Sequence, residues 1–138
     1  MLGKKPLQKP TNLRPYSCNV VINNQHLTIL EITPYYEKHN KEYLEALEKK
    51  GIKLSERELS EKLITDDLIR KVLVPQLDGK EVKRDGNKYY QWTYYSFRVY
   101  WGVKAYRLVW CVADDEPEVL GVVDCYRQGR FDKSQLKI

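Results

Sequence analysis

The sequence has few of the residues on which many kinds of site depend. Its 138 residues include only three cysteines and two histidines, His26 and His39. An odd number of cysteines with no Cys-x-x-Cys pair argues against a disulfide framework and a cysteine zinc site, and it favours a reducing compartment. Two histidines are too few for chemistry that needs several imidazoles. We therefore expect a cytoplasmic protein without a metal or other cofactor.

Long apolar runs are also missing from the chain. No segment approaches the ~20 apolar residues that a membrane-spanning helix needs, and residues 1–17 carry lysines and prolines without the apolar stretch of a secretory signal. The balance of 42% hydrophobic and 31% charged residues is typical of a globular domain. We expect a single domain over residues 18–138, preceded by a flexible basic arm over residues 1–17, and no membrane contact.

The basic residues are distributed unevenly. The net charge is +5, and the excess lies in residues 1–17, residues 83–107 and the tail from Arg127, while the middle of the chain is balanced. This distribution suggests a polyanion or an acidic protein as a partner. A basic balance can also serve solubility alone, so charge does not decide between the two interpretations.

Helical signals occupy the first half of the chain after one β-rich segment. Residues 20–32 are rich in β-branched residues around an Asn-Asn pair that can form a hairpin turn, and residues 27–32 are predicted to be a strand. Thr33 is a good helix N-cap, and Ser55 begins a capping box. We expect a helical hairpin of residues 34–50 and 55–74, with a restart of the second helix at Thr65 left open.

Alternation with a period of two dominates the second half. Strands are expected within residues 89–101, 106–113 and 119–126, with turns at Gly102 and residues 114–117. Consecutive strands with short connections form an antiparallel meander. The order of elements predicts an α+β fold, a mainly antiparallel twisted β-sheet with the helical hairpin packed on one face.

The same alternation assigns side chains to the two faces of this sheet. If the helices cover the face of Phe97 and Leu108, then Arg98, Tyr100 and Arg107 line the open face, which Arg127 can join at the end of the last strand. Clustered arginines repel unless an anion lies between them, and the guanidinium fork suits phosphate. Alternatively, each arginine is solvated and paired with an acid such as Asp124.

Three segments of the meander resemble a known family. They are SFRVY at residues 96–100, AYRLVW at residues 105–110 and VVDCYR at residues 122–127, with an acidic turn between the second and third. In this order and spacing they resemble the RelE/ParE toxin superfamily, and the YRLVW strand is the most telling part. The resemblance covers residues 96–131 and extends loosely over the strand and helical hairpin at residues 27–74.

The resemblance implies a RelE-like fold and the toxin of a type II toxin–antitoxin system. Such a toxin is an endoribonuclease (an mRNA interferase) that inhibits translation by cleaving mRNA on the ribosome, and it binds a cognate acidic antitoxin through which alone it would oligomerise. The alternatives are a ParE-like inhibitor of DNA gyrase and a nucleic-acid-binding module without catalysis. The resemblance carries catalytic roles to Arg98, Tyr100, Arg107 and Arg127. RNA contacts are expected from Lys83, Arg84, Lys104, Tyr126, Arg130 and Phe131, where Tyr126 or Phe131 would replace the tyrosine of the family that stacks on a base.

The chemistry of such a nuclease needs no metal. The 2′-OH attacks the adjacent phosphorus and the 5′-oxygen leaves, so the protein must orient the attack, stabilise charge and move two protons. Arg107 and Arg127 would stabilise the charge, and Tyr100 or Arg98 would handle the protons. Neither is a ready base, because arginine stays protonated and a phenol titrates near pH ~10. No acidic or histidine base is expected on this face. His39, which follows Glu37 on the first helix, could serve as a ligand or a base, but it is expected at the surface or the edge of the core.

Overall fold

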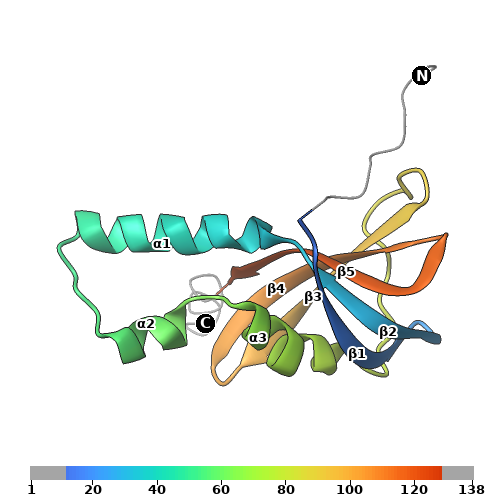
Figure 1. Cartoon of the computed structure of the whole chain (residues 1–138), viewed down its shortest axis with the longest axis horizontal. Coiled ribbons are helices and arrows are strands. Elements are labelled where there is room, and N and C mark those ends of the chain that lie inside the picture. The colour runs from blue at the N-terminus through green and yellow to red at the C-terminus, as the bar shows by residue number, and fades with distance from the viewer. Residues whose placement is uncertain (1–11, 129–138) are drawn as a thin grey trace, which may run out of the picture.

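The computed structural model describes residues 12–128 and shows an α+β fold built on a five-stranded sheet with the strand order β1-β2-β5-β4-β3 (Figure 1). The strands are β1 (Arg14–Ile22), β2 (Gln25–Ile32), β3 (Trp92–Trp101), β4 (Lys104–Ala113) and β5 (Glu116–Arg127). The helices are α1 (Glu37–Lys49), α2 (Glu56–Lys62) and α3 (Asp66–Leu68), with short helical turns η1 (Pro34–Tyr36), η2 (Ile69–Leu73) and η3 (Val74–Leu77).

The β1–β2 hairpin turns at the Asn-Asn pair, as the sequence indicates. Asn23 and Asn24 have φ angles of 53° and 63°, which asparagine tolerates and which a tight hairpin turn requires. Strand β1 already begins at Arg14, so the end of the predicted arm belongs to the sheet. Residues 1–11 of that arm lie outside the described residues.

The sheet is mixed rather than wholly antiparallel. Strands β3, β4 and β5 form the predicted antiparallel meander, whereas β2 pairs with β5 in parallel, from Ile29 opposite Val119 to Ile32 opposite Val122. The prediction of a mainly antiparallel sheet is therefore correct apart from this pair. Because β2 and β5 run in the same direction, the residues that follow β2 emerge beside the last residues of β5.

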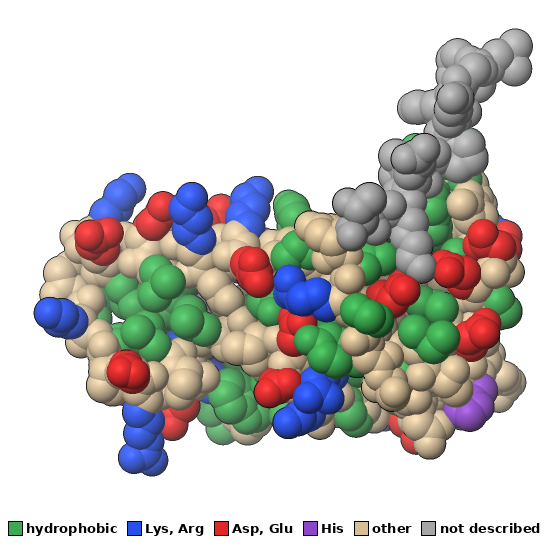
Figure 2. All heavy atoms as spheres, viewed as in Figure 1, with side chains coloured by type: hydrophobic (Ala, Val, Ile, Leu, Met, Phe, Trp, Pro, Cys, Tyr) green, Lys and Arg blue, Asp and Glu red, His purple; other side chains and the backbone are tan. Residues whose placement is uncertain are grey.

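The helical region covers the sheet only in part. Ile69, Leu73, Val74 and Leu77 are fully buried, so the segment from α3 to η3 closes the core. Helices α1 and α2 contain no buried residue, and Figure 1 shows both extending beyond the end of the sheet. The prediction that residues 34–50 and 55–74 pack on one face of the sheet therefore holds for Tyr36 of η1 and for the segment from α3 to η3, and is wrong for α2 and most of α1. Apolar side chains gather between the two helices instead (Figure 2).

Two side-chain caps settle where the second helix begins and restarts. Ser55 and Glu58 form the predicted capping box at the start of α2. The chain is extended at Leu63, and the Thr65 side chain then accepts a hydrogen bond from the Leu68 N–H at 3.0 Å. Thr65 therefore starts a separate helix, which resolves the alternative that the sequence leaves open.

One carboxylate ties these helical elements to the sheet. Asp66 accepts hydrogen bonds from Arg14 Nε at 2.6 Å and Nη2 at 2.8 Å, and from the hydroxyls of Tyr16 and Tyr36 at 2.6 Å each. Burial raises the pKa of Asp66, but these hydrogen bonds outweigh it and lower the pKa to about 2. The cluster joins β1, η1 and α3, and it fixes the point from which α1 departs.

No helix within residues 12–128 is long and apolar enough to cross a membrane.

Candidate nucleic-acid interface

Three side chains form a row across the meander, on the face opposite the core. Arg98 on β3 lies directly opposite Arg107 on β4, and Arg107 lies directly opposite Tyr126 on β5. Side chains of directly opposite residues share a face. The neighbouring residues Val99 and Leu108 are fully buried on the other face. We refer to Arg98, Tyr100, Arg107 and Tyr126 as the arginine face.

The two arginines of this row have different environments. Arg98 donates from Nε to the Gln128 side-chain oxygen at 3.2 Å. For the half-buried Arg107 guanidinium, no hydrogen bond or ion pair is found within residues 12–128. Asp124, the acid considered as a partner for the arginines, instead accepts from the Cys125 N–H at 2.8 Å and pairs with His39. Strand pairing thus places two positive charges side by side, and no carboxylate of the described residues neutralises Arg107. This arrangement favours the binding of an anion.

Tyr100 lies at the end of β3, two positions beyond Arg98 on the same face, and is 48% exposed. Its backbone is held at the sheet edge by the Gln76 side chain, which accepts from the Tyr100 N–H at 2.9 Å and donates to the Tyr100 carbonyl at 2.6 Å. The Gln76 side-chain amide therefore makes the hydrogen bonds that a neighbouring strand would make at this edge, and it fixes the position of Tyr100 beside the arginines.

Arg127 does not join the arginine face. It lies directly opposite Tyr106, on the core side of the sheet, and its guanidinium carbon is 5.8 Å from the Tyr106 ring centroid. The expectation that Arg127 joins Arg98 and Arg107 is wrong, because Tyr126 takes the register position opposite Arg107 and alternation sends the next residue to the other face.

Lys104 lies on the same side as Arg127. It pairs with Trp101, its Nζ is 3.8 Å from the Trp101 ring centroid, and it donates to the Glu61 carbonyl. Burial and the nearby charges of Arg127 and Lys62 lower the pKa of Lys104. Lys104 and Arg127 thus form a separate basic group on the opposite side of the sheet end.

The remaining predicted RNA contacts do not converge on the arginine face. Lys83 and Arg84 are exposed in the loop between η3 and β3. This loop is fixed by a hydrogen bond of 2.7 Å from the Asp85 N–H to the Tyr94 carbonyl. Tyr94 lies four residues before Arg98 on β3, which is a distance of about 13 Å at ~3.3 Å per residue. Arg130 and Phe131 lie outside the described residues.

A histidine that is not expected at the arginine face lies beside it. His39 Nε2 is 2.9 Å from Asp124 Oδ1, and its ring centroid is 5.8 Å from that of Tyr126 and 5.9 Å from that of Tyr35. The expectation that this face has no histidine or acid nearby is therefore wrong. His39 is half-buried at the edge of the structure, as expected, but its neighbours are those of the candidate site.

The parallel pairing of β2 and β5 explains this position of His39. Directly after β2, the Thr33 N–H donates to the Val122 carbonyl and the Thr33 hydroxyl donates to the Val123 carbonyl, each at 3.1 Å. These bonds anchor the start of the helical region to β5, so the first turn of α1 runs past Asp124 and Tyr126. The helix signal at Thr33 is visible in the sequence, but the pairing that places the helix is not.

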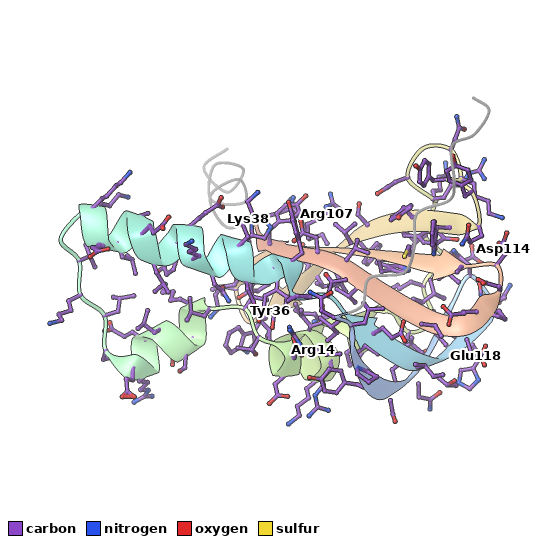
Figure 3. The ribbon with its side chains drawn as sticks, turned by 45° about the horizontal axis from the view of Figure 1, so that its top comes forward. Arg14, Tyr36, Lys38, Arg107, Asp114 and Glu118 are labelled. Atoms are coloured by element: carbon purple, nitrogen blue, oxygen red, sulfur yellow. The ribbon has the colours of Figure 1, made fainter. Side chains whose placement is uncertain are left out.

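The assembled surface combines cationic, aromatic and titratable groups. Figure 3 shows Arg107 and Lys38 projecting on the same side of the molecule, near the place where α1 meets the sheet. Within residues 12–128, no three His, Cys, Asp or Glu side chains come together as metal ligands would. Guanidinium groups bind phosphate, and a tyrosine ring beside them can stack on a base, so the chemistry of the surface suits a single-stranded nucleic acid.

Comparisons with known proteins add no relative to this picture. No protein-family model matches the chain, and neither the curated proteins nor the solved structures yield a match.

Proposed function

We propose that this protein is a RelE-like toxin of a type II toxin–antitoxin system, which cleaves ribosome-bound mRNA through attack of a 2′-OH on the adjacent phosphodiester. The observation that carries the proposal is the row of Arg98, Arg107 and Tyr126 on one face of the sheet. The resemblance of the three meander strands to the RelE/ParE superfamily supports the same assignment.

Substrate binding uses the row as a phosphate clamp with an aromatic platform. The scissile phosphate lies between Arg98 and Arg107, which relieves the repulsion between their charges and satisfies the Arg107 guanidinium. Tyr126 stacks on a neighbouring base, as aromatic side chains do with splayed single-stranded RNA. Lys104 and Arg127 contact the RNA backbone further along, on the other side of the sheet end.

The reaction is a transesterification within the RNA chain. The 2′-oxygen forms a bond to phosphorus while the bond from phosphorus to the 5′-oxygen breaks, which leaves a 2′,3′-cyclic phosphate and a 5′-OH. Negative charge grows on the non-bridging oxygens in the transition state. Arg98 and Arg107, which lie directly opposite each other on neighbouring strands, stabilise this charge more strongly than that of the ground state.

A cognate antitoxin is the proposed partner. The chain carries a net charge of +5 and displays its arginine face outside the core, so an acidic antitoxin segment that covers this face would block RNA and neutralise the toxin. Co-purification with the product of the adjacent gene tests this partner.

The test of the proposed function is cleavage of mRNA bound to purified ribosomes, with analysis of both new ends. We expect cleavage with a 2′,3′-cyclic phosphate and a 5′-OH, and no cleavage when the attacking nucleotide is replaced by its 2′-deoxy form. Binding without cleavage would instead indicate a nucleic-acid-binding module. Inhibition of gyrase with intact mRNA would indicate the ParE-like alternative.

A further inference from the structure

His39 and Asp124 form a pair at the border between α1 and β5, and this pair supplies what the arginines cannot. The reaction needs a group that accepts the 2′-OH proton, and arginine stays protonated at any working pH. We infer that His39 is the general base of the proposed cleavage and that Asp124 is the residue that positions it. The inference rests on the proposed function and adds to it the identity of the base.

The hydrogen bond between the two residues selects one tautomer of the neutral imidazole. An ionised carboxylate only accepts hydrogen bonds, so the contact of 2.9 Å assigns the ring proton to His39 Nε2. Nδ1 of the neutral ring then carries the lone pair. The nearest acid to Nδ1 is Glu42, whose Oε1 is 3.8 Å away, which is too far for a hydrogen bond. Nδ1 is therefore the atom that can take a proton.

Asp124 is itself held in place, as a positioning residue requires. Its Oδ1 accepts from the Cys125 N–H at 2.8 Å as well as facing His39, and its side chain is 20% exposed. The His39 side chain is 29% exposed, so the imidazole remains open to a substrate. The anchored acid selects one tautomer of the imidazole, and the exposure of the ring lets a substrate reach it. General-base catalysis by histidine needs both.

The His39 ring lies next to one residue of the arginine face. The His39 ring lies 5.8 Å from the Tyr126 ring, centroid to centroid, and Tyr126 is the direct strand partner of Arg107. The groups that face the imidazole are Tyr35 from η1, Glu42 from α1, and Asp124 and Tyr126 from β5. Two of these are carboxylates, which stabilise the imidazolium that forms when Nδ1 takes the proton.

The proposed step balances without a further reactant. The 2′-OH gives its proton to His39 Nδ1 as its oxygen attacks phosphorus, and the bond from phosphorus to the 5′-oxygen breaks. The departing 5′-oxygen takes a proton from water, and the imidazolium returns its proton to the hydroxide that remains. Asp124 keeps its charge throughout, because its role is to hold Nε2–H and to stabilise the imidazolium.

The experiment measures single-turnover cleavage of ribosome-bound mRNA against pH for five proteins. They are the wild type, His39→Ala, His39→Gln, Asp124→Asn and the control His26→Ala, in which the exposed histidine of β2 is removed. His39→Gln retains an amide N–H for Asp124 but cannot titrate. Thermal melts and RNA-binding measurements accompany each variant, and His39→Ala is also assayed with added imidazole.

We expect both His39 variants to lose roughly 10²-fold or more in cleavage rate with RNA affinity retained, and imidazole to restore about tenfold of the loss in His39→Ala. The wild-type rate should rise with pH, whereas both His39 variants should lose this dependence. Asp124→Asn should lower the rate without abolishing it, and His26→Ala should behave as wild type.

The outcomes separate the inference from the function beneath it. A wild type that leaves mRNA intact would overturn the proposed function and, with it, the base. If the wild type cleaves and a folded His39→Gln cleaves equally fast, the function stands and the inference is overturned. His39→Ala could also cleave slowly with no relief by imidazole while His39→Gln cleaves at the wild-type rate. That result would overturn the inference, because it would show that His39 only links α1 to β5.

Discussion

Arg98 and Arg107 lie directly opposite each other on neighbouring strands, with both side chains on the face of the sheet away from the core. Like charges in this relation destabilise a sheet, and Arg107 has no ion pair within the described part of the chain. Binding surfaces often lower the folding stability of a protein, and here a bound anion would relieve the repulsion between the two arginines.

Replacement of Arg107 by alanine should leave the free energy of unfolding unchanged or raise it by up to ~1 kcal/mol, because it removes cross-strand repulsion. Urea denaturation at low salt measures the effect. Inorganic phosphate should stabilise the wild type more than the variant, because the variant lacks half of the clamp. A loss of more than ~1 kcal/mol on this replacement would mean that Arg107 has a structural partner instead.

The Asp66 cluster should carry a measurable share of the stability. Asp66→Asn removes the charge that faces Arg14 and is expected to cost about 2 kcal/mol, from the difference between the ordinary pKa of 3.8 and the value of about 2. Asp67→Asn is the matched control, since the neighbouring carboxylate is 65% exposed and should contribute less than ~0.5 kcal/mol. Equal losses for the two variants would contradict the assignment.

The same cluster predicts a pH dependence of stability. Because folding lowers the pKa of Asp66, the stabilisation is fully present above pH ~5 and is lost as the pH falls from 3.8 towards about 2. The gap in urea midpoint between wild type and Asp66→Asn should therefore be widest near neutral pH and should narrow in acid. A gap that stays constant down to pH ~2 would exclude this origin of the stabilisation.

The two asparagines of the β1–β2 turn should respond differently to glycine. The Asn23 side chain donates to the Val82 carbonyl at 3.0 Å and accepts from the Val82 N–H at 2.7 Å, so Asn23→Gly should cost roughly 1–2 kcal/mol. Asn24 is exposed with a φ of 63°, and Asn24→Gly should change stability by less than ~0.5 kcal/mol, because glycine suits this backbone. Thermal melts of the two variants test the contrast, and a larger loss for Asn24→Gly would contradict it.

The proposed toxin activity predicts an order of events in a bacterial host. Expression without an antitoxin should arrest growth, and incorporation of labelled methionine should fall before incorporation of labelled thymidine. The reason is that cleavage of mRNA on the ribosome stops translation directly. Replication that stops first while translation continues would favour the gyrase alternative.

Local patterns in the sequence predict the elements well because their causes are local. The capping box at Ser55, the Asn-Asn turn and the alternation around Arg98 and Arg107 depend on residues a few positions apart. The parallel contact of β2 with β5 depends on segments about ninety positions apart, from Ile29 to Val119, and neither strand signals its partner.

The errors in the candidate site follow from that long-range contact and from register. The pairing of β2 with β5 brings His39 to Asp124, which alternation within single strands cannot reveal. The expectation that Arg127 can join the open face is wrong because the sequence does not show which residue of β5 lies opposite Arg107. A shift of one residue in register moves a side chain to the other face.

The most direct test of the central claim compares two arginines that lie one register position apart on opposite faces. Single-turnover cleavage of ribosome-bound mRNA is measured for the wild type, Arg107→Ala and Arg127→Ala, with thermal melts to confirm that all three fold. We expect a fall of roughly 10²-fold or more for Arg107→Ala, the loss typical of removing one donor to a transition-state oxyanion. For Arg127→Ala we expect only about a few-fold change, from one lost backbone contact. Full cleavage by a folded Arg107→Ala, or an equal loss in Arg127→Ala, would contradict the assignment of the arginine face as the reactive surface.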